Sequence, residues 1–105
     1  MSEAAWTAVA TLDDFAASDA VAVVAAGKEI AIFLVDGSAF ATANRCTHGD
    51  ARLCDGWVEG HEIECPLHQG KFDVRDGKPM CEPVTEALRS YPVKVEGQRV
   101  FLQID

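Results

Sequence analysis

Short apolar runs separated by turn residues fill most of this chain, and helical periodicity is rare. The first clear runs are residues 20–25, 30–35 and 39–43. Gly27 and Lys28 separate the first pair, and the hairpin dipeptide Asp36-Gly37 separates the second pair. Strand-length apolar runs bounded by such turn signals are typical of antiparallel sheets. The pattern therefore predicts three consecutive strands in this part of the chain.

The C-terminal part of the chain alternates apolar and polar residues most clearly. One alternating set precedes Gly97 and another follows it: Tyr91, Val93 and Val95, then Val100, Leu102 and Ile104. A further run, residues 72–75, leads into a second hairpin dipeptide, Asp76-Gly77. Helix signals are weak, and only residues 11–18, with Thr11 as the N-cap, predict a turn or two. We therefore expect an all-β fold.

The regular pattern fails between Asn44 and Gly70, and this stretch carries the candidate chemistry. It contains two short boxes, Cys46-Thr47-His48 and Cys65-Pro66-Leu67-His68, with sixteen residues between His48 and Cys65. Each box supplies one thiolate and one imidazole from a short loop. Two such loops, placed side by side like the tips of two hairpins, could present two sulfur and two nitrogen donors to a single metal centre.

These donors suit two kinds of site. Thiolate and imidazole ligate iron–sulfur clusters, and they also ligate structural zinc in tetrahedral sites. Zinc fingers usually place two cysteines before two histidines, whereas the order here alternates between the two residue types. The residues alone favour a metal centre and leave both metals open.

Length, charge and cysteine use limit the number of domains, the possible partners and the cellular compartment. The chain has 105 residues, which predicts one domain, residues 1–105. Nine basic and seventeen acidic residues leave a net charge of −8, so nucleic acids and anionic membranes are poor partners. The acidity either attracts a basic protein surface or serves solubility only. No signal peptide or membrane-spanning run is visible, so we expect a cytoplasmic protein, in which four cysteines indicate metal or redox chemistry rather than disulfides.

The spacing C-x-H, sixteen residues, C-x2-H resembles that of the Rieske family. The flanking sequences resemble those of small Rieske ferredoxins of bacterial aromatic-ring dioxygenase systems, and they read C-T-H-G-D, E-C-P-L-H-Q-G-K-F and Y-P-V-K-V-E-G. The resemblance covers the whole chain. It implies a [2Fe–2S] cluster held by Cys46 and Cys65 on one iron and by His48 and His68 on the other. It also implies stacked antiparallel sheets with a cluster-binding subdomain, about residues 44–83, formed by two hairpin loops.

The same resemblance implies an electron carrier rather than an enzyme. The expected partners are a flavin-dependent NAD(P)H reductase and a terminal Rieske non-haem iron dioxygenase, and we expect a monomer. The chain has no G-x-G-x-x-G nucleotide loop, and only His61 remains for a second iron site once the boxes are assigned. The alternatives are the small Rieske subunit of an assimilatory nitrite reductase and, from a different class, a zinc-stabilised interaction module.

The sequence also predicts the state of several other residues near the boxes. High-potential Rieske proteins carry a disulfide at positions that match Ala51 and Leu67, so none is expected here. Cys54 and Cys81 are predicted to be reduced thiols that pack as small apolar side chains. His61 is predicted to lie on the surface.

The cluster surroundings predict a low potential. High-potential relatives donate hydroxyl hydrogen bonds from positions that match Gly70 and Phe72, neither of which carries a hydroxyl group. With the charge of −8, this predicts a reduction potential of about −150 mV, at the bottom of the Rieske range. The resemblance also implies that Pro83, in the segment 80–86, covers the cluster.

Residues around the boxes are also expected to shield the cluster and to meet a partner. Trp57 and Phe72 are expected to shield it, although Trp57 could equally be a core residue. Acidic residues near the boxes, such as Asp50, Glu59 and Glu64, are expected to steer a basic docking partner.

Overall fold

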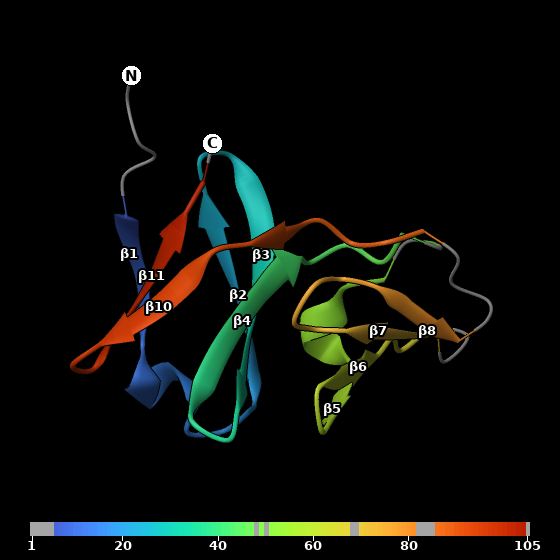
Figure 1. Ribbon diagram of the computed structural model, residues 1–105, viewed down its shortest axis with the longest axis horizontal. Helices are drawn as coiled ribbons and strands as arrows, with labels where there is room; N and C mark the ends of the chain where they lie inside the picture. Colours follow the sequence, from blue (N-terminus) through green and yellow to red (C-terminus); the bar gives the residue numbers. More distant parts are fainter. Residues whose placement is uncertain (1–5, 48, 50, 68–69, 82–85, 105) are drawn as a thin grey trace.

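The computed structural model describes residues 6–47, 49, 51–67, 70–81 and 86–104, and their strands form three antiparallel sheets (Figure 1). One sheet has the order β1-β11-β10: β1 is Trp6–Thr11, β11 is Arg99–Gln103 and β10 is Val93–Glu96. A second has the order β2-β3-β4-β9: Ala20–Ala25, Lys28–Val35, Ser38–Ala43 and Ser90–Tyr91. The third has the order β5-β6-β7-β8: Trp57–Glu59, Glu62–Glu64, Lys71–Asp73 and Pro79–Cys81. The all-β prediction is confirmed.

The first two sheets pack together as a base, and the third forms a second lobe with residues 44–56 (Figure 1). Two short 3-10 helices complete the described structure, η1 at Leu12–Phe15 and η2 at Leu53–Asp55. The predicted helix at 11–18 is therefore a single turn, and its Phe15 is buried in the base. No helix in the described ranges is long and apolar enough to cross a membrane.

The predicted hairpins of the base are present. Asp36 and Gly37 have φ angles of 51° and 81°, as a two-residue turn with left-handed backbone requires. The first turn uses Ala26 and Gly27, with φ angles of 52° and 74°, and Lys28 already begins β3. The predicted turn at Gly27 and Lys28 is thus wrong by one residue.

Pro92 divides what the alternating pattern predicted as one strand. Tyr91 pairs with β4 in one sheet, whereas Val93 pairs with β11 in the other. Proline has no backbone N–H to donate to a ladder, so the chain can change sheets there with little loss. The Pro92 carbonyl still accepts a hydrogen bond of 3.1 Å from the Gln103 amide.

The second lobe contains structure that the sequence pattern missed. Residues 44–70 were predicted to be irregular, yet β5 and β6 form a hairpin inside this range. Each strand has only three residues. Trp57 and Glu59 flank the inward-facing Val58, and two glutamates flank the inward-facing Ile63. Such short strands give too few alternations for a periodic signal. The expected hairpin at Asp76-Gly77 joins β7 and β8.

The molecule has two apolar cores, and the one that fills the second lobe also includes Ala31, Phe33 and Val35 of β3 in the base. The base core gathers side chains from both of its sheets, among them Ile30, Ile32, Val100 and Leu102. The core of the second lobe contains Leu53, Ile63, Phe72, Val74 and Leu88 together with Cys46 and Cys65. Two of the four predicted metal ligands are therefore core residues of the lobe that carries the boxes.

Candidate functional site

Cys46 and Thr47, the described residues of the first box, lie on a closed loop between β4 and η2. The Cys46 amide donates a hydrogen bond of 2.9 Å to the Ala51 carbonyl. One residue further out on each side, Arg45 and Arg52 form an isolated antiparallel bridge. The loop is therefore a small hairpin, and the Cys46 side chain is only 3% exposed.

The described residues of the second box, Cys65, Pro66 and Leu67, lie on the loop between β6 and β7, and this loop is closed in the same way. The Cys65 amide donates a hydrogen bond of 2.7 Å to the Gly70 carbonyl, again five residues further along the chain. Glu64 and Lys71 form the last pair of the ladder on either side. Inside the loop, the Leu67 amide donates to Cys65 Sγ at 3.4 Å. Both boxes thus begin with a buried cysteine whose backbone closes its own loop.

The two loops converge, as the sequence predicted. A Cβ atom built on Gly49, in the first loop, would lie 3.1 Å from Leu67 Cδ2 in the second. The thiols of Cys46 and Cys65 lie within interaction distance of each other. His48 and His68 lie outside the described residues, and no group of three or more metal-ligating side chains occurs within those residues.

The electrostatics of the paired thiols suit a metal centre. Burial, assisted by the neighbouring Cys46 thiol, raises the pKa of Cys65 to about 11, and the Leu67 hydrogen bond opposes this rise. Two adjacent buried thiolates are therefore unfavourable unless a cation neutralises them, and metal binding displaces thiol protons. The two converging thiols fit the sulfur-ligated iron of a [2Fe–2S] cluster.

A third segment adjoins the first loop. The Thr47 hydroxyl donates a hydrogen bond of 2.8 Å to the Glu86 carbonyl, across 39 residues of sequence. This bond holds the end of the segment 80–86 against the cysteine loop. Pro83 itself lies outside the described residues, so its predicted covering role stays a prediction.

Phe72 and Trp57, the aromatic residues that flank the boxes, differ in burial. Phe72 is fully buried beside both cysteines, which fits the predicted shielding role. Trp57 is 59% exposed, so its alternative as a core residue is wrong. Its partner across the β5–β6 ladder is Glu64, and the two side chains therefore share the outer face of the sheet.

The structure also shows the burial of the remaining residues, Cys54, Cys81 and His61. None of the four cysteines, all of which lie within the described residues, forms a disulfide. Cys54 is half-buried, whereas Cys81 is exposed, so the prediction of apolar packing is wrong for Cys81. His61 is half-buried rather than fully on the surface, because its ring packs edge-on against Phe40 of the base, with centroids 5.7 Å apart.

Sequence reasoning missed two residues that hold the first loop. Thr47 bonds a backbone carbonyl far away in sequence, which no local pattern reveals. Asn44 is fully buried at the end of β4 and bonds several groups of the loop stem. The only signal for Asn44 was a polar residue between a strand and a cysteine box.

Comparisons with known proteins agree with this geometry. The Rieske [2Fe-2S] domain family matches residues 5–92. A ferredoxin component of the naphthalene 1,2-dioxygenase/salicylate 5-hydroxylase systems of Ralstonia sp is 53% identical over 100 residues, which cover 95% of this chain and 96% of the relative. That relative is named as the ferredoxin component of its systems.

Solved structures with the same fold include further ferredoxins. The ferredoxin of carbazole 1,9a-dioxygenase from Nocardioides aromaticivorans IC177 is 35% identical, with a TM-score of 0.89 over 95% of this chain and 98% of that chain. A complex of reduced oxygenase and oxidized ferredoxin in carbazole 1,9a-dioxygenase matches at 33% identity, with a TM-score of 0.85 over 93% of this chain and 92% of that chain.

A putative NADH-dependent nitrite reductase small subunit from Mycobacterium tuberculosis shares the fold. Its TM-score is 0.86 over 99% of this chain and 98% of that chain, but it is only 22% identical. This likeness shows the fold alone. From its cysteine loops and its match over residues 5–92, the chain belongs to the Rieske [2Fe-2S] domain family.

Proposed function

We propose that this chain carries one electron at a time from a flavin-dependent NAD(P)H reductase to a terminal Rieske non-haem iron dioxygenase. The substrate of that dioxygenase would be an aromatic ring. The observation that carries the proposal is the convergence of two cysteine loops on a pair of buried thiols. Cys46 and Cys65 would ligate one iron, and His48 and His68 the other. When bound, the [2Fe–2S] cluster supplies a site that takes up and releases one electron.

The protein side of this function is to hold the ligands and keep water away from the sulfurs. Both cysteines lie in the apolar core with Phe72 and Leu53, which excludes water from that side. The Leu67 amide points its N–H at Cys65 Sγ, and such a bond stabilises negative charge on the sulfur. Because reduction adds negative charge, this amide favours the reduced state.

The outer face of the β5–β6 hairpin is suited to a basic partner. Trp57, Glu59, Glu62 and Glu64 share this face, because paired residues of a ladder lie on the same side. None of the ion pairs between described residues involves these three glutamates. Glu64 directly precedes Cys65, so the acidic face adjoins the second loop. Asp50 lies outside the described residues.

The proposal is tested by substitution in a related system. The protein would replace the ferredoxin of the Ralstonia naphthalene dioxygenase system, with the reductase and oxygenase of that system held constant. We expect naphthalene oxidation that depends on the added protein. The Ralstonia ferredoxin is the positive control, and absence of turnover with a fully loaded preparation of our protein would contradict the proposal.

The two alternatives have weaker support. A nitrite reductase subunit rests on a likeness of fold alone, and reduction of nitrite reductase but not of the oxygenase would favour it. A zinc module conflicts with the cofactor of the family to which the chain belongs. As part of the proposal, we expect a cytoplasmic monomer, because docking to two partners in turn needs an accessible cluster.

A further inference from the structure

Asn44 lies in the stem of the first ligand loop, two residues before Cys46, and its side chain is completely buried. A buried amide is costly unless each of its polar groups is bonded. Asn44 meets this requirement with bonds to three residues, Glu29, Leu53 and Cys54, in two segments of the chain. Each bond involves either the base or the far side of the loop.

Asn44 accepts two hydrogen bonds from the far side of the loop. Its backbone carbonyl accepts from the Leu53 amide at 2.7 Å, and its side-chain Oδ1 accepts from the Cys54 amide at 2.9 Å. These are the first two amides of η2, which the helix cannot bond internally. The N-cap residue Arg52 makes no side-chain bond to them. Asn44 therefore caps η2 from across the loop.

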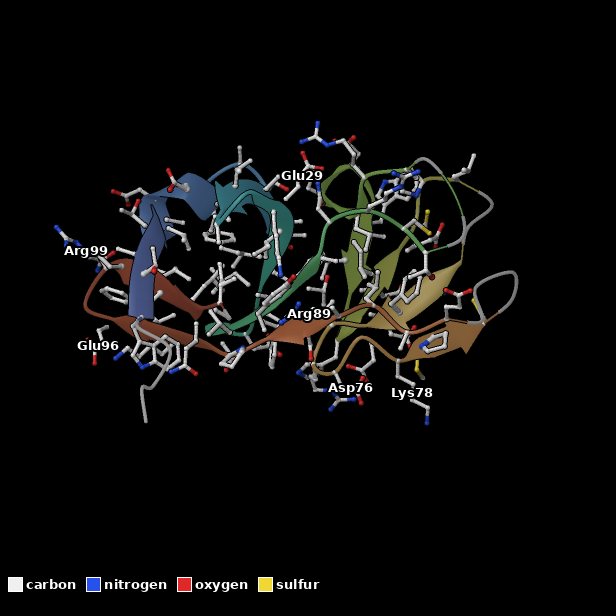
Figure 2. The ribbon with its side chains drawn as sticks, turned by 90° about the horizontal axis from the view of Figure 1, so that it is seen from above. Glu29, Asp76, Lys78, Arg89, Glu96 and Arg99 are labelled. Atoms are coloured by element: carbon white, nitrogen blue, oxygen red, sulfur yellow. The ribbon has the colours of Figure 1, made fainter. Side chains whose placement is uncertain are left out.

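Asn44 donates its remaining hydrogen bonds to the base and to Cys54. Its backbone amide donates to the Glu29 carbonyl at 3.1 Å, and Nδ2 donates to Glu29 Oε1 at 3.1 Å. Nδ2 also lies 3.5 Å from Cys54 Sγ. Glu29 Oε2 in turn meets the Arg52 guanidinium at 3.5 Å. Figure 2 shows Glu29 where the base meets the second lobe, far from Arg99 and Glu96 at the opposite end of the base.

We propose that Asn44 is a positioning residue that locks the first ligand loop, and so sets how firmly the protein holds its cluster. This inference rests on the proposed ligand set. The Asn44 clamp, formed by Asn44, Glu29 and the first amides of η2, fixes both ends of the loop that contains Cys46. A loop fixed before metal binding loses less conformational entropy when it ligates iron, and it opens less often afterwards.

Exchanging the amide of Asn44 and the carboxylate of Glu29 tests the clamp in the cluster-loaded protein. Asn44→Asp keeps an acceptor for the Cys54 amide but removes the donor to Glu29 and places two carboxylates together. In the double variant with Glu29→Gln, the new amide can donate to the new carboxylate, so the same bond returns with donor and acceptor exchanged. Thr42→Val is the matched control, because Thr42 in β4, two residues before Asn44, is equally buried, and among the described residues its hydroxyl donates to the Ala43 carbonyl alone, at 3.0 Å.

The readouts are the rate of cluster loss to an iron chelator, followed by visible absorbance, and deuterium uptake of peptides from residues 44–56. For Asn44→Asp we expect cluster loss at least about tenfold faster, since a buried bond to a charged group is lost. Uptake should rise in residues 44–56 and not in β3. The double variant should return to within about threefold of the wild-type rate, as expected when two coupled sites are restored together. Thr42→Val should lose its cluster at the wild-type rate.

Three results would overturn the clamp: a wild-type rate for Asn44→Asp, a double variant no better than Asn44→Asp, or equally fast loss from Thr42→Val. If Asn44→Asp does not fold, Glu29→Ala takes its place, and an unchanged rate in that variant refutes the inference. No reductase or oxygenase enters this assay, so a failed clamp leaves the electron-carrier proposal intact. A protein that binds no cluster at all refutes the ligand set instead.

Discussion

Gly77 offers a sharp test of how the segment after β8 is held against the second lobe. Its φ angle is +80°, and a Cβ atom built there would lie 2.1 Å from the Leu88 carbonyl oxygen. The Gly77 carbonyl also accepts a hydrogen bond from the Leu88 amide at 2.9 Å. Gly60, in the β5–β6 turn, has a φ angle of +60° but no atom within 4 Å of its built Cβ. An alanine would be strained by the left-handed backbone at both positions, but its Cβ would collide with another atom only at Gly77.

The difference can be estimated from the structure. An L-residue in the left-handed region costs about 1–2 kcal/mol, and this cost applies to both Gly60→Ala and Gly77→Ala. At Gly77 the collision also displaces Leu88, which costs about 1 kcal/mol for the broken hydrogen bond and about 1–2 kcal/mol of apolar burial. Gly77→Ala should therefore destabilise the fold by about 3–5 kcal/mol, a large part of the stability of a typical domain.

Urea unfolding of both variants measures this difference. We expect Gly60→Ala to remain folded with a modest loss of stability and Gly77→Ala to lose at least about twice as much. Because Leu88 packs in the core that contains Cys46 and Cys65, Gly77→Ala should also lose its cluster more readily. Equal stability of the two variants would refute the reasoning, since the strain alone would then account for both.

Three further outcomes follow from the site. Thr47→Val should destabilise the loaded protein by about 1 kcal/mol in urea unfolding, whereas Thr47→Ser, which keeps the bond to the Glu86 carbonyl, should not. The side-chain hydrogen bond from Arg75 lowers the pKa of Asp73, so its stabilising contribution is present above about pH 4 and is lost as the pH falls further. The stability advantage of wild type over Asp73→Asn should accordingly shrink between pH 7 and pH 3, and a constant difference would argue against the ion pair. Voltammetry should place the reduction potential near about −150 mV, and a value above zero would contradict the argument from missing hydroxyl donors.

Local signals predicted the hairpins at Asp36-Gly37 and Asp76-Gly77 and located the two boxes. The dipeptide Asp36-Gly37 determines its own turn, because both residues must adopt a left-handed backbone. Similarly, each box closes through a bond between Cys46 or Cys65 and a carbonyl five residues further along. Both features are determined by residues that lie close together in the chain, so they can be recognised from the sequence alone.

Features that depend on distant residues could not be predicted in this way. The Thr47 hydroxyl finds its acceptor 39 residues away, and Asn44 meets Glu29 only after β3 and β4 have paired. The β5–β6 hairpin escaped notice because its strands are too short for a periodic signal, and packing against the lobe core stabilises them. Trp57 was ambiguous because burial depends on which face of β5 meets that core.

The central claim is that sulfur ligates one iron and nitrogen the other. Pulsed EPR of the chemically reduced protein, grown with ¹⁵N-histidine, tests this most directly. We predict a rhombic signal whose average g value lies below the free-electron value, with strong coupling to nitrogens of two histidines that disappears when His48 and His68 are replaced by alanine. A cluster signal without histidine coupling, or a colourless protein that gives no signal, would contradict the account.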